Sequence, residues 1–110
     1  MDAYSFLPAG SGGDFAVRVL DDSLLPYVKP GEPARVRRST DLRDGDVGLF
    51  YSRSGMVFRQ FCRDSQGNIY LFPVNRRYRD RDLMIPHRRA GRLVCYGRLI
   101  LERSIPLPLD

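Results

Sequence analysis

Short apolar runs, each closed by turn-forming residues, constrain the fold of this chain most. Residues 15–20, 56–61 and 69–72 alternate or cluster apolar side chains over four to six positions. No segment keeps apolar residues at a spacing of 3.6 through three helical turns. The 10 glycines and 8 prolines supply many turns, which favour short strands over long helices. The sequence therefore predicts an all-β chain.

Six strands are predicted, with turns between them. They cover residues 15–20, 34–37, 47–51, 56–61, 69–72 and 93–101. Asp-Gly within residues 41–46 and the Gly-containing segments 52–55 and 64–67 indicate tight turns, because glycine adopts positive φ at low cost. Gly97 marks a bulge or bend in the last strand. Residues 75–92 are polar and rich in arginine, and no element is predicted there.

The length of 110 residues allows one hydrophobic core. Residues 1–13 contain several breakers and no periodicity, so a loose, flexible arm is expected before a single domain of residues 14–110. No apolar run approaches the roughly 18 residues of a membrane span, and the N-terminus shows no signal-peptide pattern. A soluble, cytoplasmic protein without membrane contact is expected.

Metal and cofactor sites are not predicted. Cys62 and Cys95 lie inside apolar runs, and the single histidine, His87, lies in a polar loop. Two cysteines alone do not complete a zinc site. We expect reduced thiols in the core, a bystander role for His87, and no cofactor.

The net charge of +5 and the pI of about 9.7 raise the possibility of nucleic-acid binding. The densest positive region contains Arg76, Arg77, Arg79, Arg81, Arg88, Arg89 and Arg92. These side chains could contact phosphates, but a solvated loop paired with Asp80 and Asp82 is the favoured interpretation. Lys29 is the only lysine, so the chain has one side-chain primary amine.

Ser23 is the first candidate for chemistry. It follows the strand 15–20 in the sequence Asp22-Ser23-Leu24-Leu25-Pro26. A serine in a sharp turn can present its hydroxyl beside free backbone N–H groups that stabilise an oxyanion. Taken alone the signal is weak, because serines in turns are usually structural.

Four segments, in this order along the chain, support a functional interpretation of Ser23. They are FAVRVLDDSLLP (15–26), LRDGDV (42–47), MVFRQF (56–61) and IYLFPVNRRY (69–78). Together they resemble the LexA and phage-repressor serine peptidase family over about four-fifths of the chain. The matching family features are a strand leading into Gly-Asp-Ser-Met-x-Pro, an Asp-Gly-Asp turn, the strand with the general base, and a strand ending in Pro-x-Asn-x-x-Tyr.

The resemblance implies a LexA/signal-peptidase-like fold of coiled antiparallel sheets with an SH3-like barrel part. It also implies a Ser-Lys mechanism, in which a neutral lysine takes the proton of the attacking serine. Family members are bacterial or phage regulators and mutagenesis proteins, and the resemblance implies that the domain dimerises. DNA binding usually belongs to a separate helix-turn-helix domain, which we expect before Met1 if the parent protein has one.

Carried over onto this sequence, Ser23 matches the nucleophile and Arg59 stands where the family has its lysine base. Arginine stays protonated in proteins and has no lone pair to accept a proton. Lys29 follows Ser23 by six residues, in a loop expected to face solvent, where lysine stays charged. We therefore expect an inactive peptidase site.

Two further positions bear on this site. Asp21 replaces the family's glycine, and it adds a side chain and a charge beside the oxyanion region. Ala9-Gly10 resembles the small pair at which family members cut themselves, but it lies closer to the serine than is usual. A flexible Pro-Gly-Ser arm is the favoured interpretation of that segment.

The preferred hypothesis is a regulatory and dimerisation domain of a LexA-like or phage-repressor-like transcriptional regulator, with an inactive peptidase fold. The alternatives are an active self-cleaving serine peptidase and a small basic nucleic-acid-binding β-barrel. The last strand supports self-association, because Leu93, Cys95, Leu99 and Leu101 are expected on one face and Val94, Tyr96 and Ile100 on the other. A strand that is apolar on both faces needs cover on both, and the apolar tail 105–109 adds surface to cover.

Overall fold

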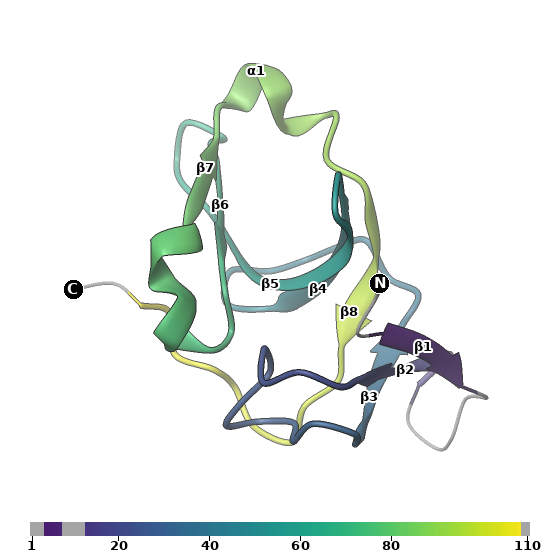
Figure 1. Ribbon diagram of the computed structural model, residues 1–110. Coiled ribbons are helices and arrows are strands. Elements are labelled where there is room, and N and C mark those ends of the chain that lie inside the picture. Colours follow the sequence, from purple (N-terminus) through teal and green to yellow (C-terminus); the bar gives the residue numbers. More distant parts are fainter. Residues whose placement is uncertain (1–3, 8–12, 109–110) are drawn as a thin grey trace.

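The computed structural model describes residues 13–108 and the backbone of residues 4–7, and its eight strands form one antiparallel sheet (Figure 1). The strands are β1 (Tyr4–Leu7), β2 (Phe15–Val19), β3 (Pro33–Arg37), β4 (Val47–Ser52), β5 (Gly55–Arg63), β6 (Ile69–Phe72), β7 (Leu83–Ile85) and β8 (Cys95–Leu99). Their order across the sheet is β1-β2-β3-β8-β4-β5-β6-β7. The all-β prediction is confirmed, and the last strand is inserted between β3 and β4.

All six predicted strands are present, within a few residues of their expected ends. Two strands are additional. β1 pairs with β2, so Tyr4–Leu7 is not the loose arm that was expected over residues 1–13. The polar segment 75–92 was also wrongly left without elements: it contains the 3-10 helix η1 (Arg76–Arg81), β7 and the short helix α1 (His87–Ala90). Neither helix has a buried residue, so no apolar periodicity marks them.

The sheet is open among the described strands, because β1 and β7 are its two edges and no pairing joins them. The barrel part implied by the resemblance is therefore not seen as a closed ring of strand pairs. The sheet bends strongly, so that β6 and β7 lie on one side of the molecule and β1 to β3 on the other (Figure 1). In the part of the chain that is described, no helix is long and apolar enough to cross a membrane.

Two hydrophobic clusters lie on opposite faces of the central strands. The first contains Leu49 and Phe58, and the second contains Phe50 and Phe61. The β4 strand therefore faces a core on both sides, and its first four residues are all buried. The sequence predicted that the last strand would be covered on both faces. In the structure, β4 is the strand with a core on each face.

A bulge in β8 changes which face its side chains occupy. Leu49 pairs with Gly97 but Phe50 pairs with Cys95, so Tyr96 is an extra residue. An inserted residue reverses the alternation of side chains along a strand. Leu99 therefore packs in the first cluster while Cys95 packs against the second. The single face predicted for Leu93, Cys95, Leu99 and Leu101 is wrong for this reason, although the bulge itself was expected at Gly97.

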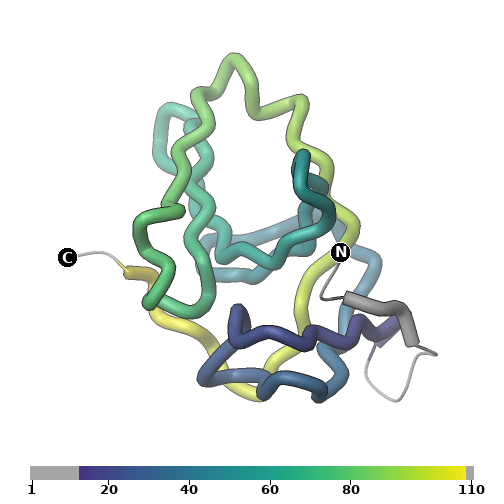
Figure 2. The backbone as a smooth tube through the Cα atoms, viewed as in Figure 1, coloured from purple at the N-terminus to yellow at the C-terminus, as the bar shows by residue number. Residues whose placement is uncertain are grey.

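The C-terminal tail packs against the domain's own core. Ile105 is 9% exposed and belongs to the first cluster. The buried side chain of Gln60 donates from Nε2 to the Ile105 carbonyl at 2.8 Å and to the Gly45 carbonyl at 3.2 Å. Figure 2 shows the tail running along the molecule toward the segment that carries η1. This part of the tail therefore needs no partner to cover it.

The turn between β5 and β6 is organised by Asp64. Its carboxylate accepts hydrogen bonds from the backbone N–H groups of Gln66 and Asn68, from Asn68 Nδ2 and from the Tyr70 hydroxyl. Burial acts to raise the pKa of Asp64, but the hydrogen bonds outweigh it and hold this pKa below its ordinary value. Gly67 completes the turn at φ 83°, a conformation that favours glycine.

Candidate active site

Ser23 lies in the turn that follows β2, as predicted. The strand ends at Val19, and Leu24, next to the serine, is buried in the first cluster. The backbone N–H groups of Tyr27 and Val28 both donate to the Leu24 carbonyl. The buried leucine and these bonds fix the position of the serine backbone.

The backbone N–H of Ser23 is already bound by a carboxylate. It donates to Asp21 Oδ1 at 3.0 Å, the local pattern of an aspartate that bonds two residues ahead. An oxyanion hole needs free N–H groups where negative charge develops. A carboxylate in that place removes a donor and adds a negative charge that repels an oxyanion. The departure from glycine at Asp21 therefore has a direct structural effect.

The hydroxyl of Ser23 is enclosed and has no hydrogen-bond partner. Its Oγ atom is buried, and no described residue donates to it or accepts from it. A serine nucleophile is normally activated by a base within about 2.6–3.2 Å. The structure therefore presents Ser23 without an adjacent base.

A latch joins the Ser23 turn to the segment after β6. Asn75 donates from its backbone N–H to the Ser23 carbonyl at 3.2 Å and from Nδ2 to the Asp22 carbonyl at 2.8 Å. The Tyr78 hydroxyl donates to Asp22 Oδ1 at 2.6 Å, and Arg77 lies 3.5 Å from the other oxygen of that carboxylate. We call Asn75 and Tyr78 with their bonds to Asp22 and Ser23 the Asn75 latch.

The residues of the Asn75 latch belong to a motif that is visible in the sequence, but no role was predicted for them. Asn75 and Tyr78 are the polar positions of the Pro-x-Asn-x-x-Tyr segment that contributed to the family resemblance. Asn75 also begins η1, since its Oδ1 accepts from the Arg77 N–H at 3.0 Å. The hydrogen bond to Asp22 is the main reason that the pKa of Tyr78 lies above its ordinary value. The motif therefore positions the serine turn.

Arg59 lies in β5, on the side of the strand that also carries Val57 and Phe61. It pairs with Gly48 across the ladder, and Val57 and Phe61 on its side belong to the second cluster, whereas Phe58 belongs to the first. Its side chain is half-buried, and Nη1 donates to the Phe58 carbonyl at 2.9 Å. No hydrogen bond joins it to Ser23 Oγ. Whether Arg59 takes the place of the family's base stays a prediction.

The other proposed participants lie away from this chemistry. Lys29 is exposed, and its backbone N–H bonds Glu32 within the loop after the serine turn. Ala9 and Gly10 lie outside the described residues. Among the described residues, no group of three potential metal ligands is found.

The arginine-rich segment forms ion pairs and ring contacts. Arg76 donates from Nη1 and Nη2 to the two carboxylate oxygens of Asp82, at 2.7 and 2.8 Å, while Arg81 lies over the Tyr78 ring. Asp82 is thus one of the two predicted partners of the arginines. The backbone N–H of His87 donates to Asn68 Oδ1 at 2.9 Å, and the imidazole ring of His87 lies against Gly67.

The two cysteines are unpaired and half-buried. Cys95 packs against the second cluster. Burial is the main cause that raises the pKa of both Cys62 and Cys95 above the ordinary value. Neither thiol is thus activated as a nucleophile, because the thiolate is the reactive form.

The family comparison agrees with this geometry. The profile of the Peptidase S24-like family matches residues 3–94. The matched region holds the serine turn, β5 with Arg59 and the Asn75 latch. A search of curated proteins finds no match. The chain belongs to the Peptidase S24-like family.

Proposed function

We propose that this Peptidase S24-like domain is a non-catalytic regulatory and dimerisation module of a LexA-like or phage-repressor-like transcriptional regulator. One observation carries the proposal: Ser23 has a buried Oγ without a hydrogen-bond partner and an N–H that is bound by Asp21. Contact with DNA is assigned to a separate domain, and the place of action is the cytoplasm. The proposed role of this domain is to hold subunits together.

The loss of catalysis follows from two properties of the site, the missing base and the carboxylate in the oxyanion region. The serine has no neighbouring base, and Arg59, the residue that stands for the family's lysine, does not deprotonate. The carboxylate of Asp21 disfavours an oxyanion at the Ser23 N–H. Each property acts on a different part of acyl transfer, so restoring one of them alone is not expected to restore hydrolysis.

Active-site labelling tests the catalytic part of the proposal. Purified protein is incubated with a fluorophosphonate probe from pH 7 to pH 10 for several days, and intact mass is measured. We expect no adduct and no chain cleavage. The double variant Asp21→Gly/Arg59→Lys should gain slow labelling, and the same pair with Ser23→Ala should lose it. Stoichiometric labelling of Ser23 in the unmodified protein would show that the domain is an active peptidase.

Self-association is proposed through an exposed apolar face at the end of β4 and the start of β8. Tyr51, Val94 and Tyr96 are 60%, 48% and 42% exposed. Tyr51 and Val94 are neighbours, because the Tyr51 N–H donates to the Val94 carbonyl at 3.0 Å. Large exposed apolar side chains that adjoin one another are typical of interfaces, and a two-fold dimer is the commonest way to bury them.

Light scattering at micromolar concentration tests this interface. The unmodified protein should have the mass of a dimer, and Val94→Glu should reduce it to that of a monomer. Met84→Glu is the matched control, because Met84 is 49% exposed but lies on the edge strand β7, away from β4 and β8. A monomer mass that does not change with concentration would exclude the proposed dimer, and dissociation by Met84→Glu alone would move the interface to β7.

A further inference from the structure

Two arginines occupy directly opposed positions on neighbouring strands. Arg37, the last residue of β3, pairs directly with Arg98 of β8. Side chains of directly opposed residues lie on the same face of a sheet, with Cβ atoms about 5 Å apart. Like charges in this position destabilise the sheet. The pair therefore needs a stabilising factor that outweighs the repulsion.

The charges of this pair are not neutralised within the described chain. No ion pair joins Arg37 or Arg98 to a carboxylate among residues 13–108. The Nε atom of Arg98 is buried and has no hydrogen-bond partner there. A buried donor without an acceptor costs about 1–3 kcal/mol, so the described chain leaves both the charge and part of the hydrogen-bonding capacity of Arg98 unsatisfied.

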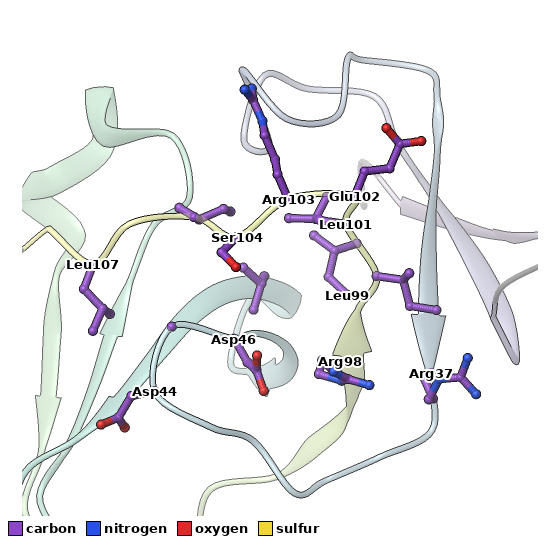
Figure 3. A pocket seen from close by; sticks show the side chains of 14 residues that line it. Arg37, Asp44, Asp46, Arg98, Leu99, Leu101, Glu102, Arg103, Ser104 and Leu107 are labelled. Carbon is purple, nitrogen blue, oxygen red and sulfur yellow. The ribbon is translucent and has the colours of Figure 1, made fainter.

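Both arginines line one pocket of about 620 Å³. Its walls come from the loop between β3 and β4 and from the chain after β8. Figure 3 shows this loop passing around Arg98 and linking Arg37 to the Asp44 and Asp46 turn. Both arginines thus border a concave surface that is large enough for a small molecule.

Three acidic residues, Asp44, Asp46 and Glu102, also line the pocket. Two of them accept backbone hydrogen bonds that hold the loop between β3 and β4. Asp44 accepts from the Arg63 N–H at 2.9 Å, and Asp46 accepts from the Arg43 N–H at 2.8 Å. These carboxylates fix the turn that forms one wall. Figure 3 shows Asp44 at the end of the pocket away from Arg37, with Asp46 between Asp44 and Arg98 in this view. Besides Glu102, Arg103 also lines the pocket.

We propose that Arg37 and Arg98 form a binding site for a small oxyanion, a phosphate or carboxylate group of a low-molecular-weight ligand. Planar guanidinium groups match such groups in a bidentate manner. An oxyanion bound to the outer guanidinium nitrogens of both arginines neutralises the like-charge pair. This site is separate from Ser23 and does not depend on the proposed loss of catalysis.

Titration with inorganic phosphate and, separately, with acetate tests the site, with sodium chloride at matched ionic strength as the reference. Binding is followed by amide chemical shifts of the full chain. We expect saturable shifts at the residues of the pocket. Arg98→Gln should weaken binding about tenfold, the equivalent of about 1.4 kcal/mol, and Arg37→Gln should weaken it several-fold.

Two further variants make the result specific. Arg35→Gln removes the same charge from the same strand outside this pocket, so binding should not change. Asp46→Asn keeps an acceptor for the Arg43 N–H but removes a nearby negative charge, so binding should become several-fold tighter. Binding of phosphate alone or of acetate alone would each support the proposal and identify the class of ligand.

Equal shifts with chloride, or an equal loss of affinity in Arg35→Gln and Arg98→Gln, would overturn the proposal. Destabilisation by Asp46→Asn with no gain in affinity would also overturn it, because Arg98 would then be paired with Asp46 in solution. Arg37 is exposed, so Arg37→Gln reports on binding even if Arg98→Gln affects folding. The tests of labelling and dimerisation are independent of these outcomes.

Discussion

Replacing Asn75 with alanine should loosen the serine turn and destabilise the domain by about 2 kcal/mol. The side chain makes two hydrogen bonds that alanine cannot make: Nδ2 to the Asp22 carbonyl at 2.8 Å, and Oδ1 from the Arg77 N–H at 3.0 Å. A neutral hydrogen bond contributes about 1 kcal/mol, and loss of a helix-capping side chain also costs about 1 kcal/mol. The two bonds have different partners, so we add the two values.

Thermal unfolding measures this loss. For a domain of this size, 1 kcal/mol lowers Tm by about 4 °C, so Asn75→Ala should lower it by about 8 °C. Asn75→Asp separates the two bonds, because aspartate retains the acceptor for the Arg77 N–H but has no donor for the Asp22 carbonyl. Asn75→Asp should lose at least the stability contributed by the hydrogen bond from Nδ2, about 1 kcal/mol.

Hydrogen exchange shows where the structure opens. In Asn75→Ala, the amides of residues 22–25 should exchange faster, while those of the β5–β6 turn should not change. Asn68→Ala is the matched control, because Asn68 also makes two side-chain bonds, to Asp64 and to the His87 N–H. If Asn75→Ala lowers stability by less than about 0.5 kcal/mol, or if exchange at residues 22–25 is unchanged, the Asn75 latch does not hold the turn.

Three other perturbations have defined outcomes. Gly97→Ala should destabilise the domain by about 3 kcal/mol in chemical denaturation, the upper end of the overpacking range, because the new Cβ would lie 2.5 Å from the Arg37 carbonyl oxygen; a loss below 1 kcal/mol would contradict this. Gln60→Leu should cost about 2 kcal/mol by leaving the Ile105 carbonyl unpaired, and limited proteolysis should cut the tail faster than in the unmodified protein. The pKa of Asp64 is lowered on folding, so its stabilising effect is full above the ordinary value of about 3.9 and is lost as pH falls through the folded-state pKa. Asp64→Asn should therefore be less stable than the unmodified protein at pH 6, with a smaller difference at pH 2, and a difference that does not depend on pH would refute this assignment.

The amino-acid sequence determined the strands and turns because their causes are local. Alternating apolar residues produced β2 and β5, and Gly55 and Gly67 closed the two hairpins with positive φ. The turn position of Ser23 was also local, since the alternation ends at Asp21. The bond from the Ser23 N–H to Asp21 spans two residues, and it was foreseen only as a disturbance of the oxyanion region.

Elements without an apolar pattern could not be predicted in this way. The 3-10 helix η1 and the helix α1 bury none of their residues. The edge strand β7 is only three residues long, and two of them are exposed. Such segments are held by pairing with β6 and by capping bonds. Several of the partners in these hydrogen bonds come from other parts of the chain, so they are not visible in the local sequence.

Only the tertiary structure decided how distant segments meet. The insertion of β8 between β3 and β4 placed Arg98 opposite Arg37, which lies 61 positions earlier in the chain. The same folding brought Asn75 to Asp22 across 53 positions. The bulge at Tyr96 then assigned Cys95 and Leu99 to different cores. A strand's alternation states which side chains share a face, but its neighbours are chosen by the burial and hydrogen bonding of the whole sheet, and those quantities are properties of all the strands together.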